Sequence, residues 1–264
     1  MSSRAQDVAG RPLTRDQLLE ELEFLAEVEH ALVVECLSVC CALGHDLDAA
    51  EGGATTKQGG DAAAAASLLA QDEMRHLKAV NNALIKAGRS ARLGRAPSVS
   101  SDSVAVTPLD PPSLAQLEQL VAREHAIASA VDERYAKLRP AVTSDPVFDG
   151  GLLTDLQSVI DGGTKHAAAF AAMTDSLTGL APAAFLRATR RDGADAFEDR
   201  LLDVSDRSYD MVVRALDYEF GQDPESIVPS LFHDLARQAM DSLDAINHAL
   251  VQRGLLPPFT VTSR

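Results

Sequence analysis

With 264 residues, 46% of them hydrophobic, the chain could form one large domain or a bundle with an appended piece. A net charge of −15 argues against nucleic acid and against an anionic membrane surface as partners. No apolar run approaches the roughly 18 residues of a transmembrane helix, and the N-terminus lacks the apolar stretch of an export signal. We therefore expect a cytoplasmic protein.

Apolar spacing predicts six helices, over about 14–43, 61–87, 113–139, 152–177, 194–220 and 229–253. Thr14 is the expected N-cap of the first helix, Gly88 closes the second, and Pro140 ends the third. A Gly-, Ala- and Thr-rich loop, 44–60, joins the first two helices, and a long connection rich in Ser, Pro and Arg, 88–112, joins the second to the third.

Four helices with one long crossover between the second and third have the connectivity of ferritin-like bundles. We therefore predict an all-α fold, with a ferritin-like four-helix bundle over 14–180 and a C-terminal helical hairpin over 181–264. The hairpin is expected to pack on the bundle; walling off a substrate pocket and packing on another subunit, as in a homodimer, stay open.

The three cysteines, Cys36, Cys40 and Cys41, all lie within the first predicted helix. One helical turn rarely suits disulfide geometry. We interpret them as reduced, buried thiols that fill the core.

Each of the first four predicted helices has one apolar stripe that steps alternately by three and four residues and is interrupted near its middle. In chain order, the interruptions are Glu29, Glu73 with His76, Glu124, and Gly163 with His166. When helices of similar length pack along such stripes, their middles meet. We expect these side chains to converge at one level of the bundle.

Buried carboxylates are costly unless a cation or a partner neutralises them. Three carboxylates and two imidazoles at one level repel one another without a metal, and with one they form a ligand set. A single Glu or His on an apolar stripe is more often a helix-end or solvent-facing residue than a ligand, so the prediction depends on the coincidence in four helices. We predict one or two iron ions, with manganese as the alternative, bound by Glu29, Glu73, His76, Glu124 and His166.

Two segments, LAEVEHALVVECL over 25–37 and DEMRHLKAVNNALIKAG over 72–88, resemble the ferritin-like domain of the iminophenyl-pyruvate dimer synthase family. The resemblance covers roughly 16–175, about one domain. It implies that the first and third helices each provide a Glu, and the second and fourth each a Glu-x-x-His. The same five residues match this pattern.

Two positions depart from the pattern. Gly163 stands where the second Glu-x-x-His would have its carboxylate, and Cys36 stands where the resemblance implies a tyrosine. Asp161 is near Gly163 in sequence but points about 200° away on a regular helix. His30 and His125 lie one residue off the stripes, where support of a ligand and ordinary packing are both open.

The leading hypothesis is an oxidase or oxygenase in specialised metabolism that uses dioxygen on a small organic substrate, itself an anion with a carboxylate. The alternative is a degenerate ferritin-like protein that binds metal or a ligand, or scaffolds a complex, without catalysis. A third option is that the buried carboxylates pair with Lys or Arg. This is the weakest, because none lies on the four stripes.

Overall fold

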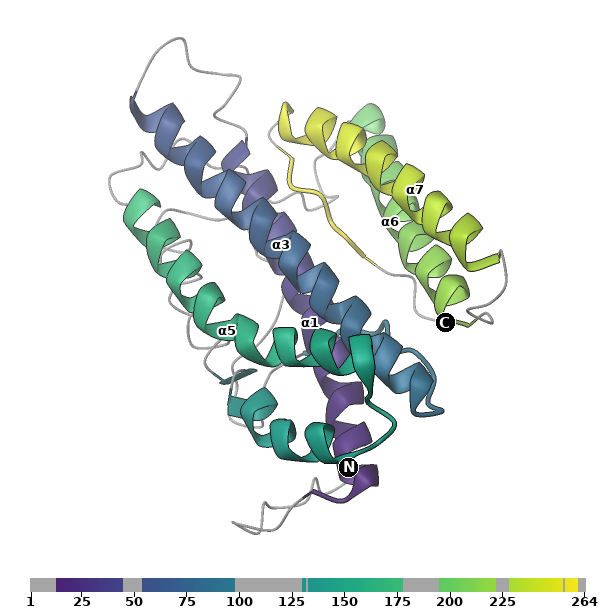
Figure 1. The fold of residues 1–264 in the computed structure, drawn as a ribbon. Helices are drawn as coiled ribbons and strands as arrows, with labels where there is room; N and C mark the ends of the chain where they lie inside the picture. The colour runs from purple at the N-terminus through teal and green to yellow at the C-terminus, as the bar shows by residue number, and fades with distance from the viewer. Residues whose placement is uncertain are drawn as a thin grey trace.

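The computed structural model describes residues 13–44, 54–97, 130–131, 133–177, 195–221, 228–253 and 255–260. Within them the regular elements are helices, and no strand occurs, which confirms the all-α prediction for this part of the chain (Figure 1). The elements are α1 (Arg15–Gly44), α3 (Ala54–Lys86), a helical segment over 133–144, α5 (Gly150–Leu177), α6 (Ala196–Phe220) and α7 (Val228–Val251). None of the helices in these ranges is long and apolar enough to cross a membrane.

The predicted ends of the first two helices have clear local causes. The Thr14 backbone N–H donates to Gln17 Oε1 at 2.9 Å, and the Gln17 backbone N–H donates to Thr14 Oγ1 at 3.3 Å, so the two residues form a reciprocal cap. At the end of α3, Gly88 has a φ of +82°, a left-handed conformation that favours glycine. The backbone N–H of Arg89 then donates to the Leu84 carbonyl at 2.8 Å, which is a Schellman closure.

Two predicted boundaries are wrong. The second helix begins at Ala54 and not near 61, so residues 54–60 of the predicted loop 44–60 are helical. Glycine costs a helix about 1 kcal/mol relative to alanine, and Gly59 and Gly60 suggested a break. The buried alanines that follow, Ala62 and Ala66, pack against α1, and the helix extends backwards from this anchored part.

The third predicted helix does not end before Pro140, because the chain stays helical to Ser144. Leu138 and Val142, on either side of the proline, are each 1% exposed and belong to the main core. Their burial stabilises the helical backbone across the hydrogen bond that proline cannot donate. The predicted first part of this helix, 113–129, lies outside the described residues.

Four helical segments share the main core. One fully buried leucine from each illustrates this: Leu25, Leu84, Leu138 and Leu156. α1 packs against α3, and α3 against α5 (Figure 1). The segment 133–144 runs antiparallel to α1, since Arg134 pairs with Glu21 whereas Asp145 pairs with Arg15.

After α3 the chain turns back along α1. Asn81 accepts a hydrogen bond from the Arg92 backbone N–H at 2.6 Å and anchors the start of this return. The side chain of Arg92 pairs with Glu23 at 2.7 Å, and the Ala96 N–H donates to the Glu27 carbonyl at 2.9 Å. The first part of the predicted long connection therefore runs parallel to α1, and its residues 98–112 lie outside the described part.

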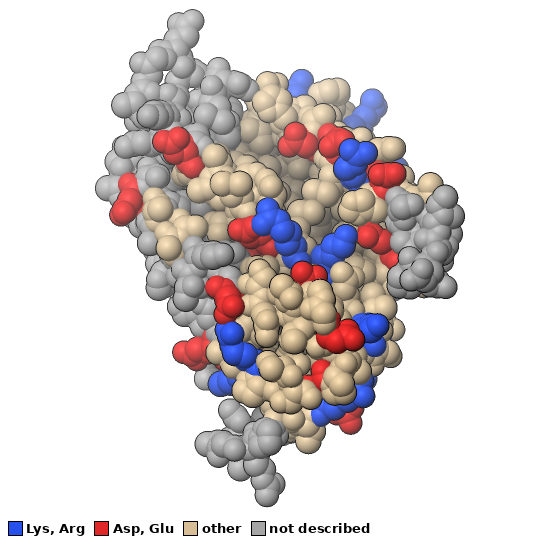
Figure 2. All heavy atoms as spheres, viewed as in Figure 1, with Lys and Arg blue, Asp and Glu red and all other residues tan. Residues whose placement is uncertain are grey.

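α6 and α7 pack against each other, and a buried cluster connects them to α1. The cluster consists of Val34, Tyr209, Val213, Leu243 and Phe259. Figure 2 shows acidic and basic side chains interspersed over the visible face of the molecule. The division of the chain near residue 180 stays a prediction, since 178–194 is not described, and the homodimer also stays a prediction.

Candidate metal centre

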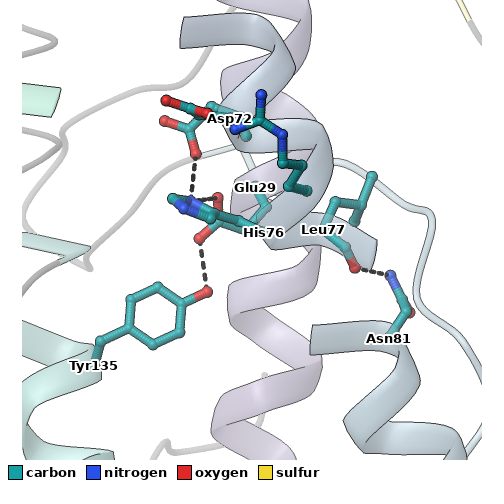
Figure 3. Close-up of polar contacts among 8 residues, drawn as sticks. Glu29, Asp72, His76, Leu77, Asn81 and Tyr135 are labelled. Atoms are coloured by element: carbon teal, nitrogen blue, oxygen red, sulfur yellow. Dashed lines mark hydrogen bonds and ion pairs between the residues drawn. The ribbon is translucent and has the colours of Figure 1, made fainter. Parts of the chain in front are cut away.

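Glu29 on α1 and Glu73 and His76 on α3 come together between the two helices (Figure 3). One ligand-type atom of each residue lies within 4.8 Å of the others. Glu29 is 1% exposed and Glu73 2% exposed, so two carboxylates lie in the core of the molecule. The i, i+3 spacing on α3 places Glu73 and His76 on the same side of that helix.

The three side chains meet at an imidazole nitrogen. His76 Nδ1 lies 3.1 Å from Glu73 Oε2 and 3.5 Å from Glu29 Oε2. The other oxygen of Glu29, Oε1, accepts a 2.6 Å hydrogen bond from the hydroxyl of Tyr135. Figure 3 shows Tyr135 reaching this cluster from the 133–144 segment, opposite α3.

The electrostatics of the cluster favour a cation. Burial, and next the charge of Glu73, raise the pKa of Glu29 to about 7. Burial alone would lower the pKa of His76, but the nearby carboxylates of Glu29 and Glu73 outweigh it and raise that pKa to about 10. Without a metal, the proton on His76 is therefore the positive charge that balances the carboxylates. A metal ion would replace this proton, because a ligating imidazole must be neutral.

The donor set fits a divalent transition metal. Glu29 Oε2 is buried and accepts no hydrogen bond within the described residues, although His76 lies 3.5 Å away. Such an acceptor is costly unless a cation approaches it. Mixed carboxylate and imidazole donors suit iron or manganese. Two carboxylates also balance the charge of one divalent ion.

The structure thus brings together three of the five predicted ligands. Glu124 lies outside the described residues. His166 and Gly163 lie in α5, but the side-chain surroundings of 162–167 are likewise not described.

The course of α5 keeps Gly163 and His166 as candidate positions of the metal site. Ile160 shares a core cluster with Leu77, and Ala169 packs on the cluster that contains Ala70. α5 therefore passes the level of Glu73 between residues 160 and 169. Asp161 is excluded as a substitute ligand, because its side chain is 61% exposed and pairs with Arg139.

His30 faces away from the cluster. Its Nδ1 lies 2.9 Å from the Leu93 carbonyl, and its Nε2 lies 2.5 Å from the Tyr209 hydroxyl. Burial, and next the charge of Arg95, lower the pKa of His30 to about 4, so the ring is neutral. A carbonyl can only accept, so Nδ1–H donates to Leu93 and the tyrosine donates to Nε2. His30 thus holds the return segment and α6 against α1; His125 is not described.

The three cysteines are free thiols, as predicted, but only Cys36 is buried, whereas Cys40 and Cys41 are half-buried. Cys36 is buried beside Ala66 and Leu69. Burial raises the pKa of Cys40 to about 11, so the reactive thiolate is scarce at neutral pH.

The sequence interpretation missed the role of Tyr135. Tyr135 follows Glu124 on the apolar stripe of the third predicted helix, after Ala128 and Val131, and this spacing indicates a core residue. The available signal was its hydroxyl, since a buried tyrosine usually needs a hydrogen-bond partner. Within the described residues, the side chain that this helix brings to Glu29 is the phenol of Tyr135.

Comparisons with known proteins gave no assignment. No family model matches the chain, and neither curated proteins nor solved structures show a significant match. The resemblance to the ferritin-like domain of the iminophenyl-pyruvate dimer synthase family therefore stays a prediction.

Proposed function

We propose that this chain is a ferritin-like metal protein that holds a divalent transition metal at Glu29, Glu73 and His76. The observation that carries the proposal is the convergence of these three donors in the core, with a buried carboxylate oxygen that accepts no hydrogen bond from the described residues. The ferritin-like architecture is supported by four helical segments around one core and by a return segment that runs back along α1.

We further propose that the metal is iron, with manganese as the alternative, and that the activity is oxidation of a small organic molecule by dioxygen. When bound, the metal would supply the redox chemistry and coordination positions for external ligands. Glu29 and Glu73 would provide charge balance, and the apolar core around them would exclude water. His76 would give up its proton when it binds.

A carboxylate-bearing substrate is part of this proposal. Its support is Gly163, which has no side chain and so removes one negative charge where the resemblance implies a fourth carboxylate. An anion bound there would restore the charge balance of a site with two ions. The same glycine favours a second candidate, a protein that binds metal or a ligand without catalysis.

The test is anaerobic loading with Fe²⁺, followed by metal analysis and by oxygen uptake with small organic carboxylates. We expect stoichiometric iron in the wild type and its loss in Glu73→Ala and in His76→Ala. The matched control is Glu20→Ala, which removes an exposed carboxylate from α1. Folded wild-type protein that stays free of both iron and manganese would contradict the metal proposal. Metal binding without oxygen uptake would favour the second candidate.

A further inference from the structure

We infer that Tyr135 is a positioning residue that makes Glu29 a one-oxygen metal ligand. The inference deepens the proposed function and rests on its metal site. Tyr135 is 2% exposed and Glu29 1% exposed, so the 2.6 Å hydrogen bond between them is shielded from water. A bond from a hydroxyl to a carboxylate is roughly twice as strong as one between neutral groups.

Tyr135 is held firmly enough to direct its partner. Its ring belongs to the main core, together with Leu22 and Leu138. The neighbouring Arg134 donates to Glu21 at 2.9 Å and lies 4.5 Å from the centre of the Phe24 ring. These contacts fix the third helix against α1 on both sides of the phenol.

The phenol engages one specific oxygen of Glu29. Oε1 is engaged by the hydroxyl, while Oε2 faces His76 Nδ1 at 3.5 Å. Glu73 Oε2 lies on the same nitrogen at 3.1 Å. The donors that converge are therefore one oxygen from each carboxylate and one nitrogen. A metal chelated by both oxygens of Glu29 would share Oε1 with the Tyr135 hydroxyl, and this hydrogen bond makes Oε1 the weaker donor to the metal.

The consequence is a preference among metals. Ca²⁺ takes six to eight oxygen ligands and often binds carboxylates through both oxygens. A site with one imidazole and one-oxygen carboxylates suits a transition metal better. Tyr135 would thus disfavour Ca²⁺, and it would also disfavour a second ion bridged through Oε1 of Glu29.

The experiment compares Tyr135→Phe with the wild type and with Tyr209→Phe. The control also removes one buried tyrosine hydroxyl, but that hydroxyl bonds His30 and not the cluster. The probes are Co²⁺, Mn²⁺ and Ca²⁺, measured by equilibrium dialysis, with the visible spectrum of bound Co²⁺ as a report on coordination number.

Loss of a group that orients a metal ligand typically weakens binding 10- to 100-fold. We expect Tyr135→Phe to weaken Co²⁺ and Mn²⁺ by at least about tenfold, to leave Ca²⁺ binding equal or stronger, and to shift the Co²⁺ spectrum toward higher coordination. Tyr209→Phe should leave all three unchanged. Equal affinities and spectra in wild type and Tyr135→Phe would overturn this inference but not the proposed metal site.

A measurement on the wild type keeps the test independent of the variant's folding. In infrared difference spectra, metal-loaded minus metal-free, one-oxygen ligation widens the separation of the two carboxylate stretches, and chelation narrows it. We expect a wide separation. A spectrum with only chelated carboxylates would overturn the inference, and a wild type that binds no metal would overturn it together with the proposed function.

Discussion

The hydroxyl of Tyr209 on α6 donates a 2.5 Å hydrogen bond to Nε2 of His30 on α1, across 179 residues of sequence. Glu29, the preceding residue on α1, faces a different helix, α3. α1 therefore contributes Glu29 to the cluster with Glu73 and His76, and contacts the C-terminal hairpin through the next residue, His30. Successive helical residues differ in direction by about 100°, which is why neighbouring polar residues serve different contacts.

This arrangement predicts that Tyr209→Phe destabilises the fold without disturbing the cluster. Loss of the donor leaves Nε2 of His30 buried and unsatisfied, so we expect the free energy of unfolding to fall by about 1–3 kcal/mol. Chemical denaturation measures this, and metal titration serves as the control. A loss of metal affinity as large as in Tyr135→Phe would contradict the separation of the two sites.

The metal-free protein should lose stability as the pH rises. The pKa of His76 is raised to about 10 in the folded state, from about 6.5 in an unfolded chain. Its contribution is thus fully present below about pH 6.5 and is lost as the pH rises through about 10. The raised pKa of Glu29, about 7, acts in the same direction at lower pH. Urea titrations at about pH 6, 8 and 10 measure the free energy of unfolding. We expect this free energy to fall more steeply with rising pH in the wild type than in His76→Ala.

The control for this pH series is His248→Ala, which removes an exposed histidine from α7. It should reproduce the wild-type decline. If His76→Ala shows the same decline as the wild type, His76 does not hold a proton between the two carboxylates.

Gly163→Glu should strengthen a second metal position, because it restores Glu-x-x-His in α5. Replacement of a mid-helix glycine should also favour the helix by up to about 1 kcal/mol. Metal analysis gives the number of ions per chain, and Gly162→Glu, one residue away on the helix, is the control. Unchanged stoichiometry in folded Gly163→Glu protein would count against the alignment of this helix with the ferritin-like pattern.

Small carboxylates should perturb the metal-loaded protein more than neutral amides of matched size. In a site with two ions, an external anion would replace the carboxylate that is missing at Gly163 and restore the charge balance, whereas a site with one ion would gain nothing from it. The measurement is titration of the metal's absorption spectrum with both series. Equal effects of the two series, or no binding, would contradict an anionic substrate.

The sequence by itself determined the helices and the position of the cluster on them. Apolar residues at steps of three and four give a helix one buried face, and this spacing predicted α1, α5, α6 and α7 to within a few residues. The Glu73–His76 pair was also visible, because residues three apart lie on one side of a helix. Local rules suffice for such features.

Tertiary structure decided everything that depends on contacts between distant segments. Tyr135 could be placed on a stripe, but only the packing of the third helix against α1 shows that its hydroxyl meets Glu29, 106 residues away. The direction of His30 and the helical course through Pro140 were decided in the same way. In each case burial between segments far apart in sequence outweighs local preference, and no spacing along the chain records it.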